Sequence, residues 1–285
     1  MQIKRLSFFD RLVGIVALML LLLSAAQSAQ AGLMLYPTRV VLDNKDRSAQ
    51  VEIINNGDKP ETYRIGLVNR RMSATGELIS ADKPEAGEKF AIDMIRFSPR
   101  QVTLQPGKAQ TVRIMVRKPD GLEAGEYRSH LQFDRMADVE GAANLENLAK
   151  PGAGEISIVL QALVGASIPV IVRHGETKLT TTLTDIAVEQ GRDKEQLLAF
   201  TINREGNRSV YGDLVATFTP ADSKPIEVSR VSGVAVYVPN AQRKTKLPIK
   251  LPEGVALKKG VLTLRYLDRP DAGGKLLAEV KLAMP

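Results

Sequence analysis

Cysteine and tryptophan are absent from this 285-residue chain, histidine occurs only twice, and aromatic residues make up 5% of the sequence. Without cysteine the chain has no disulfide scaffold, no thiolate nucleophile and no cysteine-based zinc site. The scarcity of aromatic side chains removes the stacking platforms on which single-stranded nucleic acids bind. His130 lies on the polar phase of its expected strand with Arg128, and His174 lies near an expected domain joint, so neither has a partner set for a metal or for acid–base catalysis. We therefore expect no enzymatic activity, no cofactor and no metal site.

The composition that remains is that of a globular protein with an excess of positive charge. Apolar side chains account for 44% of the residues and charged side chains for 25%, which is typical neither of disorder nor of a polytopic membrane protein. The net charge of +7 is compatible with nucleic acid, an anionic membrane or an acidic partner. At roughly 100 to 150 residues per domain, the length indicates two domains.

Residues 1–31 have the pattern of an export signal. Three basic residues precede an uninterrupted apolar run, 12–23, and an A-x-A motif that ends at Ala31 predicts cleavage before Gly32. The alternative, a single membrane anchor, requires about 20 apolar residues, so no stable membrane insertion is expected. Cleavage removes three basic residues and one acidic residue, which lowers the net charge from +7 to +5. Export to the periplasm separates the chain from intracellular nucleic acid, which is therefore not an expected partner.

From Gly32 onward, apolar and polar residues alternate in short runs bounded by Asn, Asp, Gly or Pro, the pattern of β-strands. The first set of expected strands is 34–42, 50–55, 62–68, 92–97, 102–104, 111–117, 126–133 and 156–172. The second set is 178–186, 197–203, 212–219, 227–231, 234–238, 244–250, 261–267 and 274–283. A single short helical turn is expected within 141–150. The pattern predicts an all-β fold of two tandem immunoglobulin-like β-sandwich domains, residues 32–174 and 175–285.

Two neighbouring segments depart from this pattern. Residues 134–154, rich in Ala, Gly and Asn, form an unusually long connection and are predicted to be either disordered or functional. The run that follows alternates most regularly, and one of its faces carries Ile156, Ile158, Leu160, Ala162 and Val164. This run is interpreted as a strand with one buried face. Pro169 favours an edge position, where a long apolar strand needs a covering partner.

Four stretches, taken together in their order along the chain, resemble a known family. They are the opening strand 37–42, the strand and turn 51–56, the segment 125–128, and above all residues 97–114, Phe-Ser-Pro-Arg-Gln-Val-Thr-Leu-Gln-Pro-Gly-Lys-Ala-Gln-Thr-Val-Arg-Ile. Together, behind an export signal, they are similar to the PapD-like periplasmic chaperones of pilus assembly by the chaperone/usher route. The resemblance covers nearly the whole chain after residue 31. It is weaker in the second domain, which lacks the disulfide that many relatives carry there.

The resemblance implies two immunoglobulin-like domains in an L-shaped arrangement and a chaperone function. In this family the chaperone completes a pilus subunit, which lacks its last strand, by donor-strand complementation, and delivers it to an outer-membrane usher. The matching donor residues here are Ile156, Ile158, Leu160, Ala162 and Val164. The free protein is expected to be either a monomer or a self-capping dimer.

The resemblance also implies roles for four charged residues. Arg39 matches the arginine that anchors the C-terminal carboxylate of the bound subunit. The family's second cation, a lysine late in the donor strand, has no counterpart, since residues 156–172 contain no Lys or Arg. Arg39 is therefore expected to act with backbone donors or with Arg173. Glu126, Arg173 and Asp268 match an interdomain ion network, although the sequence around Asp268 differs from the family pattern.

Two other classes of function are weighed against this one. A structural pilus subunit or surface adhesin should be a single incomplete domain with a short N-terminal donor peptide, whereas this chain has a tandem pair. A carbohydrate-binding or hydrolytic sandwich would be expected to carry tryptophan or a cluster of carboxylates, which are missing here.

Overall fold

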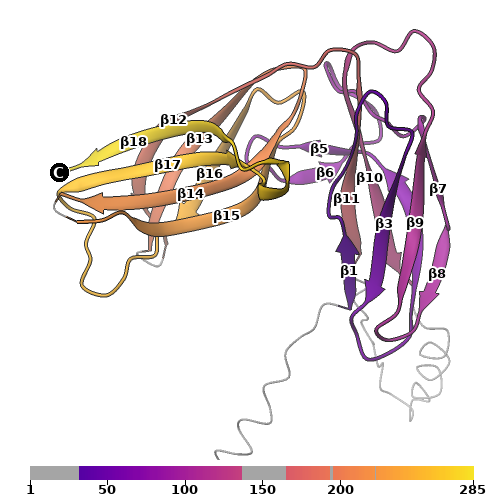
Figure 1. The fold of residues 1–285 in the computed structure, drawn as a ribbon, viewed down its shortest axis with the longest axis horizontal. Helices are drawn as coiled ribbons and strands as arrows, with labels where there is room; N and C mark the ends of the chain where they lie inside the picture. Colours follow the sequence, from indigo (N-terminus) through magenta and orange to yellow (C-terminus); the bar gives the residue numbers. More distant parts are fainter. Residues whose placement is uncertain (1–31, 137–164, 193–194, 222) are drawn as a thin grey trace, which may run out of the picture.

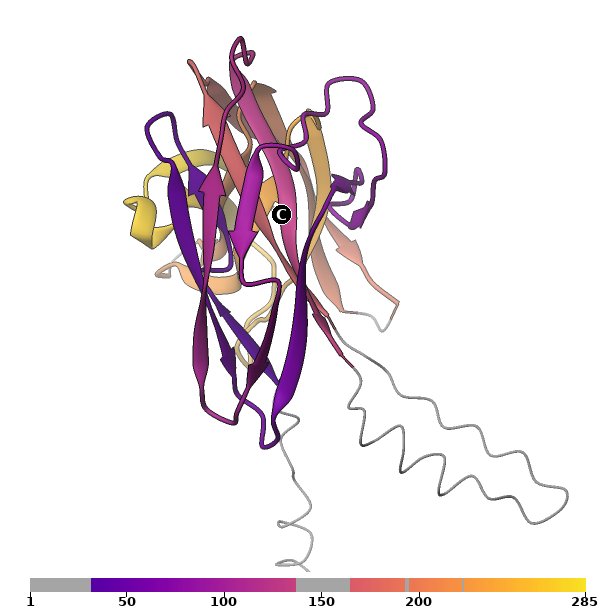
Figure 2. The ribbon, with the colours of Figure 1, turned by 90° about the vertical axis from the view of Figure 1, so that its right-hand side faces the viewer.

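The computed structural model describes residues 32–136, 165–192, 195–221 and 223–285. Within these ranges every regular element is a β-strand except one 3-10 turn, η1 (Pro270–Ala272). The strands build two β-sandwiches that meet at an angle and give the molecule an L shape (Figure 1). Figure 2 shows the first sandwich in front, with the second extending behind it. The prediction of an all-β fold with two tandem sandwiches is confirmed.

The first sandwich consists of two facing sheets. One has the order β1 (Leu33–Tyr36), β3 (Ser48–Asn55), β9 (Ala109–Val116) and β7 (Ile95–Ser98). The other has the order β2 (Val40–Leu42), β11 (Ala166–His174), β10 (Gly125–Arg135), β4 (Glu61–Val68) and β8 (Gln101–Leu104). The single strand expected at 34–42 is divided, because Pro37 has no N–H for a ladder and the chain crosses from one sheet to the other at 37–39.

Alternation of side chains explains the core of this sandwich. In β3, Val51 and Ile53 are fully buried between the sheets, while Glu52 between them is exposed. Branched side chains suit the pleated surface of a half-buried strand. Burial of each contributes about 1.5–3 kcal/mol to the free energy of unfolding. The period-two pattern therefore identifies the inward face correctly.

In the described residues, the second sandwich has seven strands, the number found in immunoglobulin-like domains. One sheet has the order β12 (Leu179–Gln190), β13 (Gln196–Gly206) and β16 (Gln242–Pro248). The other has the order β15 (Ile226–Val236), β14 (Val210–Pro220), β17 (Gly260–Asp268) and β18 (Leu276–Met284). The two strands expected at 227–231 and 234–238 form one strand, β15. Gly233, at φ +73°, accommodates the irregularity between them, opposite a register shift in β14.

A short hairpin, β5 (Arg70–Met72) and β6 (Leu78–Ser80), leaves the first sandwich and reaches toward the second (Figure 1). It lies in a region where alternation predicts no strand. Its Met72 is buried in a small apolar cluster with Ile171 of the first sandwich and Tyr237 of the second. The hairpin therefore fills the inner angle of the L.

The outer face of β10 is buried by this arrangement. His130 is 0% exposed and Arg128 is 7% exposed, although both point away from the core of the first sandwich. The Arg128 Nη2 donates to the carbonyl of Arg70 at 3.0 Å, and its Cζ lies 4.0 Å from the centre of the Tyr237 ring. His130 does lie on the polar phase of β10, but that phase faces the hairpin and the second sandwich rather than solvent.

Several predictions fall outside the described residues. These are the helical turn within 141–150 and the donor residues Ile156, Ile158, Leu160, Ala162 and Val164. The described part of the last strand expected in the first domain is β11. In the described residues, no helix has the length and apolar character needed to cross a membrane.

Candidate binding cleft between the two sandwiches

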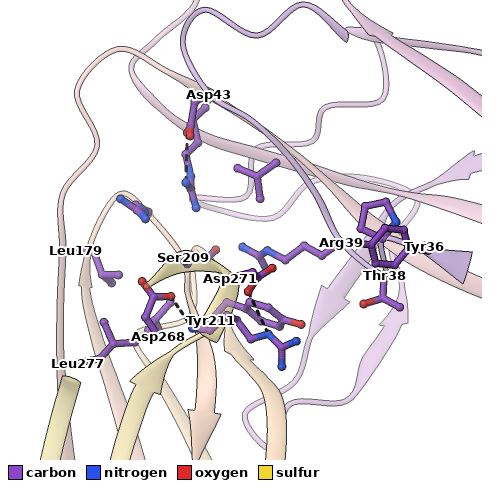
Figure 3. Close-up of a pocket in the computed structure, with 17 residues that line it drawn as sticks. Tyr36, Thr38, Arg39, Asp43, Leu179, Ser209, Tyr211, Asp268, Asp271 and Leu277 are labelled. Carbon is purple, nitrogen blue, oxygen red and sulfur yellow. Dashed lines mark hydrogen bonds and ion pairs between the residues drawn. The ribbon is translucent and has the colours of Figure 1, made fainter. Parts of the chain in front are cut away.

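A cleft of about 660 Å³ opens where the two sandwiches meet (Figure 3). Its basic lining residues are Arg39 and Arg173 from the first sandwich and Arg208 and Arg269 from the second. Its acidic lining residues are Asp43, Asp268 and Asp271. Cations from both sandwiches therefore face one space, which favours an anionic ligand.

Arg39 lies on the connection between β1 and β2 and reaches into the cleft toward Tyr211 and Asp271 (Figure 3). Its Cζ lies 4.4 Å from the centre of the Tyr211 ring and 5.5 Å from that of Tyr237. Its Nη1 also donates to the Tyr237 hydroxyl at 3.3 Å. Guanidinium groups are attracted to the negative faces of aromatic rings, so the two tyrosines hold this side chain in place.

The Arg39 guanidinium has N–H donors that remain available to a ligand. Within the described residues, no carboxylate lies within ion-pair distance of this guanidinium. A planar guanidinium binds a carboxylate through two parallel hydrogen bonds, which neither a lysine nor a lone hydroxyl can do. The position and free donors of Arg39 are therefore suited to a carboxylate.

Glu126 and Arg173 face each other across β10 and β11. The Arg173 Nε donates to Glu126 Oε2 at 3.1 Å, and its Nη1 donates to Asp43 Oδ1 at 3.3 Å. The exposed fraction is 3% for Glu126 and 8% for Arg173, so the pair is desolvated. A buried ion pair requires further hydrogen bonds to offset the loss of hydration, and each partner here has at least one.

The second sandwich supplies the additional bonds of Glu126. Ser209, at the start of β14, donates its backbone N–H to Glu126 Oε2 at 3.3 Å and its hydroxyl to Glu126 Oε1. Ser209 Oγ in turn accepts the N–H of Val238 at 3.0 Å. Glu126 therefore joins the two sandwiches through a hydroxyl.

Asp268, at the end of β17, lines the cleft from the second sandwich. Its Oδ1 accepts the backbone N–H of Arg269 at 2.9 Å, and within the described chain its carboxylate has no ion pair within 4.0 Å with Arg173. The structure thus brings Glu126 and Arg173 together and places Asp268 in the same cleft, apart from that pair.

Arg208 is the second cation of the cleft with an unused donor. Its Nε is buried and has no hydrogen-bond partner among the described residues. Burial, and next the positive charge of Arg173, lowers the pKa of the Arg208 guanidinium. An arginine side chain is effectively always protonated in proteins, so Arg208 remains a cation in the cleft.

Sequence reasoning does not find Arg208, Ser209, Tyr211 or Tyr237. Each lies in or beside a strand of the second sandwich, and nothing in its local sequence indicates that it meets Arg39 or Glu126. A cationic residue next to a serine and a tyrosine, as in residues 208–211, is too common a pattern to mark a site. Only the angle between the sandwiches brings these residues together.

No metal centre accompanies the cleft in the part of the chain that the structure describes, because no three His, Asp or Glu side chains gather there as ligands. Fold and cleft together define a protein of two β-sandwiches with a basic, tyrosine-lined cleft at their junction.

Several solved structures of chaperones are similar to this chain. The YadV chaperone is 12% identical with a TM-score of 0.45, and the match covers 89% of this chain and 100% of YadV. The CupB2 chaperone of Pseudomonas aeruginosa is 11% identical with a TM-score of 0.45, and the match covers 88% of this chain and 100% of that one. The SafB chaperone of Salmonella enterica was solved with the SafA pilin. It is 14% identical with a TM-score of 0.43, and the match covers 90% of this chain and 98% of the other chain.

No protein-family model and no curated protein sequence matches the chain. At these identities and TM-scores, the solved structures assign no functional residue to this chain.

Proposed function

We propose that this chain is a periplasmic chaperone that binds pilus subunits by strand donation, anchors their C-terminal carboxylate at Arg39 and delivers them to an outer-membrane usher. The observation that carries the proposal is the Arg39 guanidinium, held against Tyr211 and Tyr237 in a cleft, with free donors. The motifs at 37–42 and 97–114 support it independently. Residues 1–31 direct export and are removed, and the mature chain acts in the periplasm.

The donor strand is residues 156–164, which lie outside the described residues. Support for this role comes from the regular alternation of its apolar side chains and from the pairing of the adjoining strand. β11 pairs with β10 along its whole length but with β2 only at Val170–Val172. In the described part of the chain, residues 166–169 thus have a strand on one side only, and an incoming strand can extend the sheet there.

Arg208 serves as the second cation in this proposal. Arg173 already donates to Glu126 and Asp43, so its fork is occupied. Arg208 lines the same cleft as Arg39 and retains a buried, unpartnered Nε. A carboxylate held by one arginine from each sandwich replaces the arginine–lysine clamp that the resemblance implies.

The alternative of a structural pilus subunit or adhesin is less well supported. A pilus subunit lacks one strand of its sandwich, whereas each sandwich here has two facing sheets within the described residues. The free chaperone is expected to cover its edge by forming a self-capped dimer until a subunit displaces it.

Co-expression with pilus subunits encoded near its gene tests the anchoring role. Arg39→Ala should lower the amount of subunit recovered from the periplasm about tenfold or more, because a charge-assisted hydrogen bond is worth about 1.5–3 kcal/mol. The thermal unfolding midpoint of the chaperone itself should change little. Arg113→Ala, at an exposed position on β9, is the matched control. Equal recovery with Arg39→Ala and with the control would exclude Arg39 as the anchor.

A further inference from the structure

Gly32, the residue after the predicted cleavage site, lies directly against the carboxylate of Glu61. A Cβ placed on Gly32 would lie 2.9 Å from Glu61 Oε2 and 3.0 Å from Oε1, so both oxygens face this Cα. The backbone is held there, because Asn56 donates its N–H to the Gly32 carbonyl at 2.9 Å and Leu33 pairs with Asn55 of β3. The nitrogen of Gly32 is one bond of about 1.46 Å from the same Cα. It is therefore also within a few ångströms of the carboxylate.

Glu61 is a buried anion with room for another donor. It is 7% exposed at the start of β4, receives the Tyr63 hydroxyl on Oε2, and lies 3.1 Å from the Nη2 of Arg135 through Oε1. A carboxylate has about four lone-pair directions, of which these contacts use two. Burial, and then the hydrogen bond to Glu61 and the charge of Glu61, raises the pKa of Tyr63 well above its usual value. Tyr63 and Arg135 thus hold the Glu61 carboxylate in place beside Gly32.

We propose that Glu61 is the binding site for the α-ammonium group that signal-peptide removal creates on Gly32. This inference rests on the proposed export of the chain. Hydrolysis of the Ala31–Gly32 peptide bond adds the hydroxyl of water to the Ala31 carbonyl carbon and leaves an amine on Gly32. That amine takes up a proton at neutral pH, since an α-amino group has a pKa of about 7.7–8.0. A neutral amide with one donor becomes a cation with three.

The ion pair is available only to the processed chain. In the precursor the same nitrogen is an uncharged amide that continues into residue 31. After cleavage, rotation about the Cα–C bond of Gly32 is no longer restrained by a preceding residue, and the ammonium can turn to Glu61. Glycine suits this position because a side chain here would push into the carboxylate. The first sandwich therefore gains an additional ion pair after export.

Two versions of the chain test the proposal. One is the periplasmic protein, whose first residue N-terminal sequencing should identify as Gly32, and the other carries an Ala-Ser extension before Gly32. The extension should lower the unfolding midpoint by about 2–4 °C, the shift expected for a small loss of stability in a chain of this size. Acetylation of the α-amine at a pH low enough to leave the lysines protonated and unmodified should have the same effect, which provides a readout without mutation of Glu61. In Glu61→Gln both modifications should lose their effect, whereas in Glu52→Gln, an exposed carboxylate on β3, both should keep it.

An equal midpoint for the free, extended and acetylated forms would overturn the proposal, as would a first residue other than Gly32. Subunit recovery in the co-expression assay reports on the chaperone function separately, because Glu61 lies outside the cleft. Glu61→Gln should leave that recovery unchanged. Equal unfolding midpoints for the three forms, together with normal recovery of the subunit, would thus refute the N-terminal site and leave the proposed chaperone function standing.

Discussion

His130 shows how a single residue can couple stability to pH in this protein. The imidazole is fully buried, and neither ring nitrogen has a hydrogen-bond partner among the described residues. Burial, followed by the positive charges of Arg128 and Arg70, lowers the pKa of His130 from 6.5 to about 3. The folded protein therefore holds a neutral imidazole over most of the range in which the unfolded chain takes up a proton.

The free energy of unfolding is expected to fall as the pH decreases from about 6.5 toward 3. In that window the unfolded state binds a proton at His130 that the folded state does not, so stability is lost at up to about 1.4 kcal/mol per pH unit. Urea denaturation at pH 7.5 and pH 5 measures the difference. His130→Gln should reduce it, and His174→Gln, which removes the partly exposed imidazole at the end of β11, serves as control. An unchanged pH dependence in His130→Gln would contradict this account.

Single residues also mark where prediction from sequence reaches its limit. Alternation correctly places His130 with Arg128 on the polar phase of β10. It carries no information about what covers that phase, because the covering groups, Arg70 and Tyr237, are distant in sequence. The close approach of Glu126 to Arg173 follows from strand pairing, whereas the contribution of Ser209 depends on the angle between the sandwiches.

At the scale of elements, the β5–β6 hairpin connects the two sandwiches. Asn240 donates its Nδ2 to the carbonyls of Met72 at 2.8 Å and Ser73 at 3.3 Å. The backbone N–H of Lys244, on β16, donates to the carbonyl of Ala74 at 2.9 Å. The hairpin thus hydrogen-bonds to the second sandwich through its own backbone and stabilises the L-shaped arrangement.

Asn240→Ala should loosen this connection. It removes the donor for two partly buried carbonyl contacts, and each hydrogen bond contributes about 0.5–1.5 kcal/mol. We expect a loss of about 1–3 kcal/mol in the free energy of unfolding and faster hydrogen exchange at Lys244. Asn203→Ala is the matched control, because its side chain donates hydrogen bonds to Thr182 and Thr184 on the neighbouring strand β12. If hydrogen exchange at Lys244 stays as slow as in the wild type, the hairpin does not fix the second sandwich.

Alternation predicts the long strands but not this hairpin. β3 and β10 have enough alternating residues to identify, whereas β5 and β6 have three residues each, and β5 begins with two arginines. Such a hairpin is stabilised by what it packs against, here Ile171 and Tyr237, rather than by its own sequence. The two short strands expected at 227–231 and 234–238 are one strand for a different reason. The irregularity at Gly233 interrupts the alternation of side chains but does not interrupt the sheet.

At the scale of the whole molecule, the contacts that hold the two sandwiches together lie in the same cleft as the proposed binding residue Arg39. The Glu126–Arg173 pair and Ser209 connect the two sandwiches at one wall of the cleft, and Arg39 stacks on tyrosines of the second sandwich at another. A ligand that enters the cleft therefore meets groups from both sandwiches at once. The net charge of +5 expected after removal of residues 1–31 matters less for binding an anionic ligand than the placement of these few arginines.

The central claim is that residues 156–164 enter a pilus subunit as a strand, with every second side chain in its groove. Recovery of the subunit in complex with the chaperone, by co-expression and purification from the periplasm, measures this directly. Leu160→Asp should abolish recovery of the complex, because a carboxylate would have to enter an apolar groove, whereas Gln161→Asp, on the opposite phase, should leave most of the complex intact. Equal recovery with the two variants, whether both high or both low, would contradict strand donation by this segment.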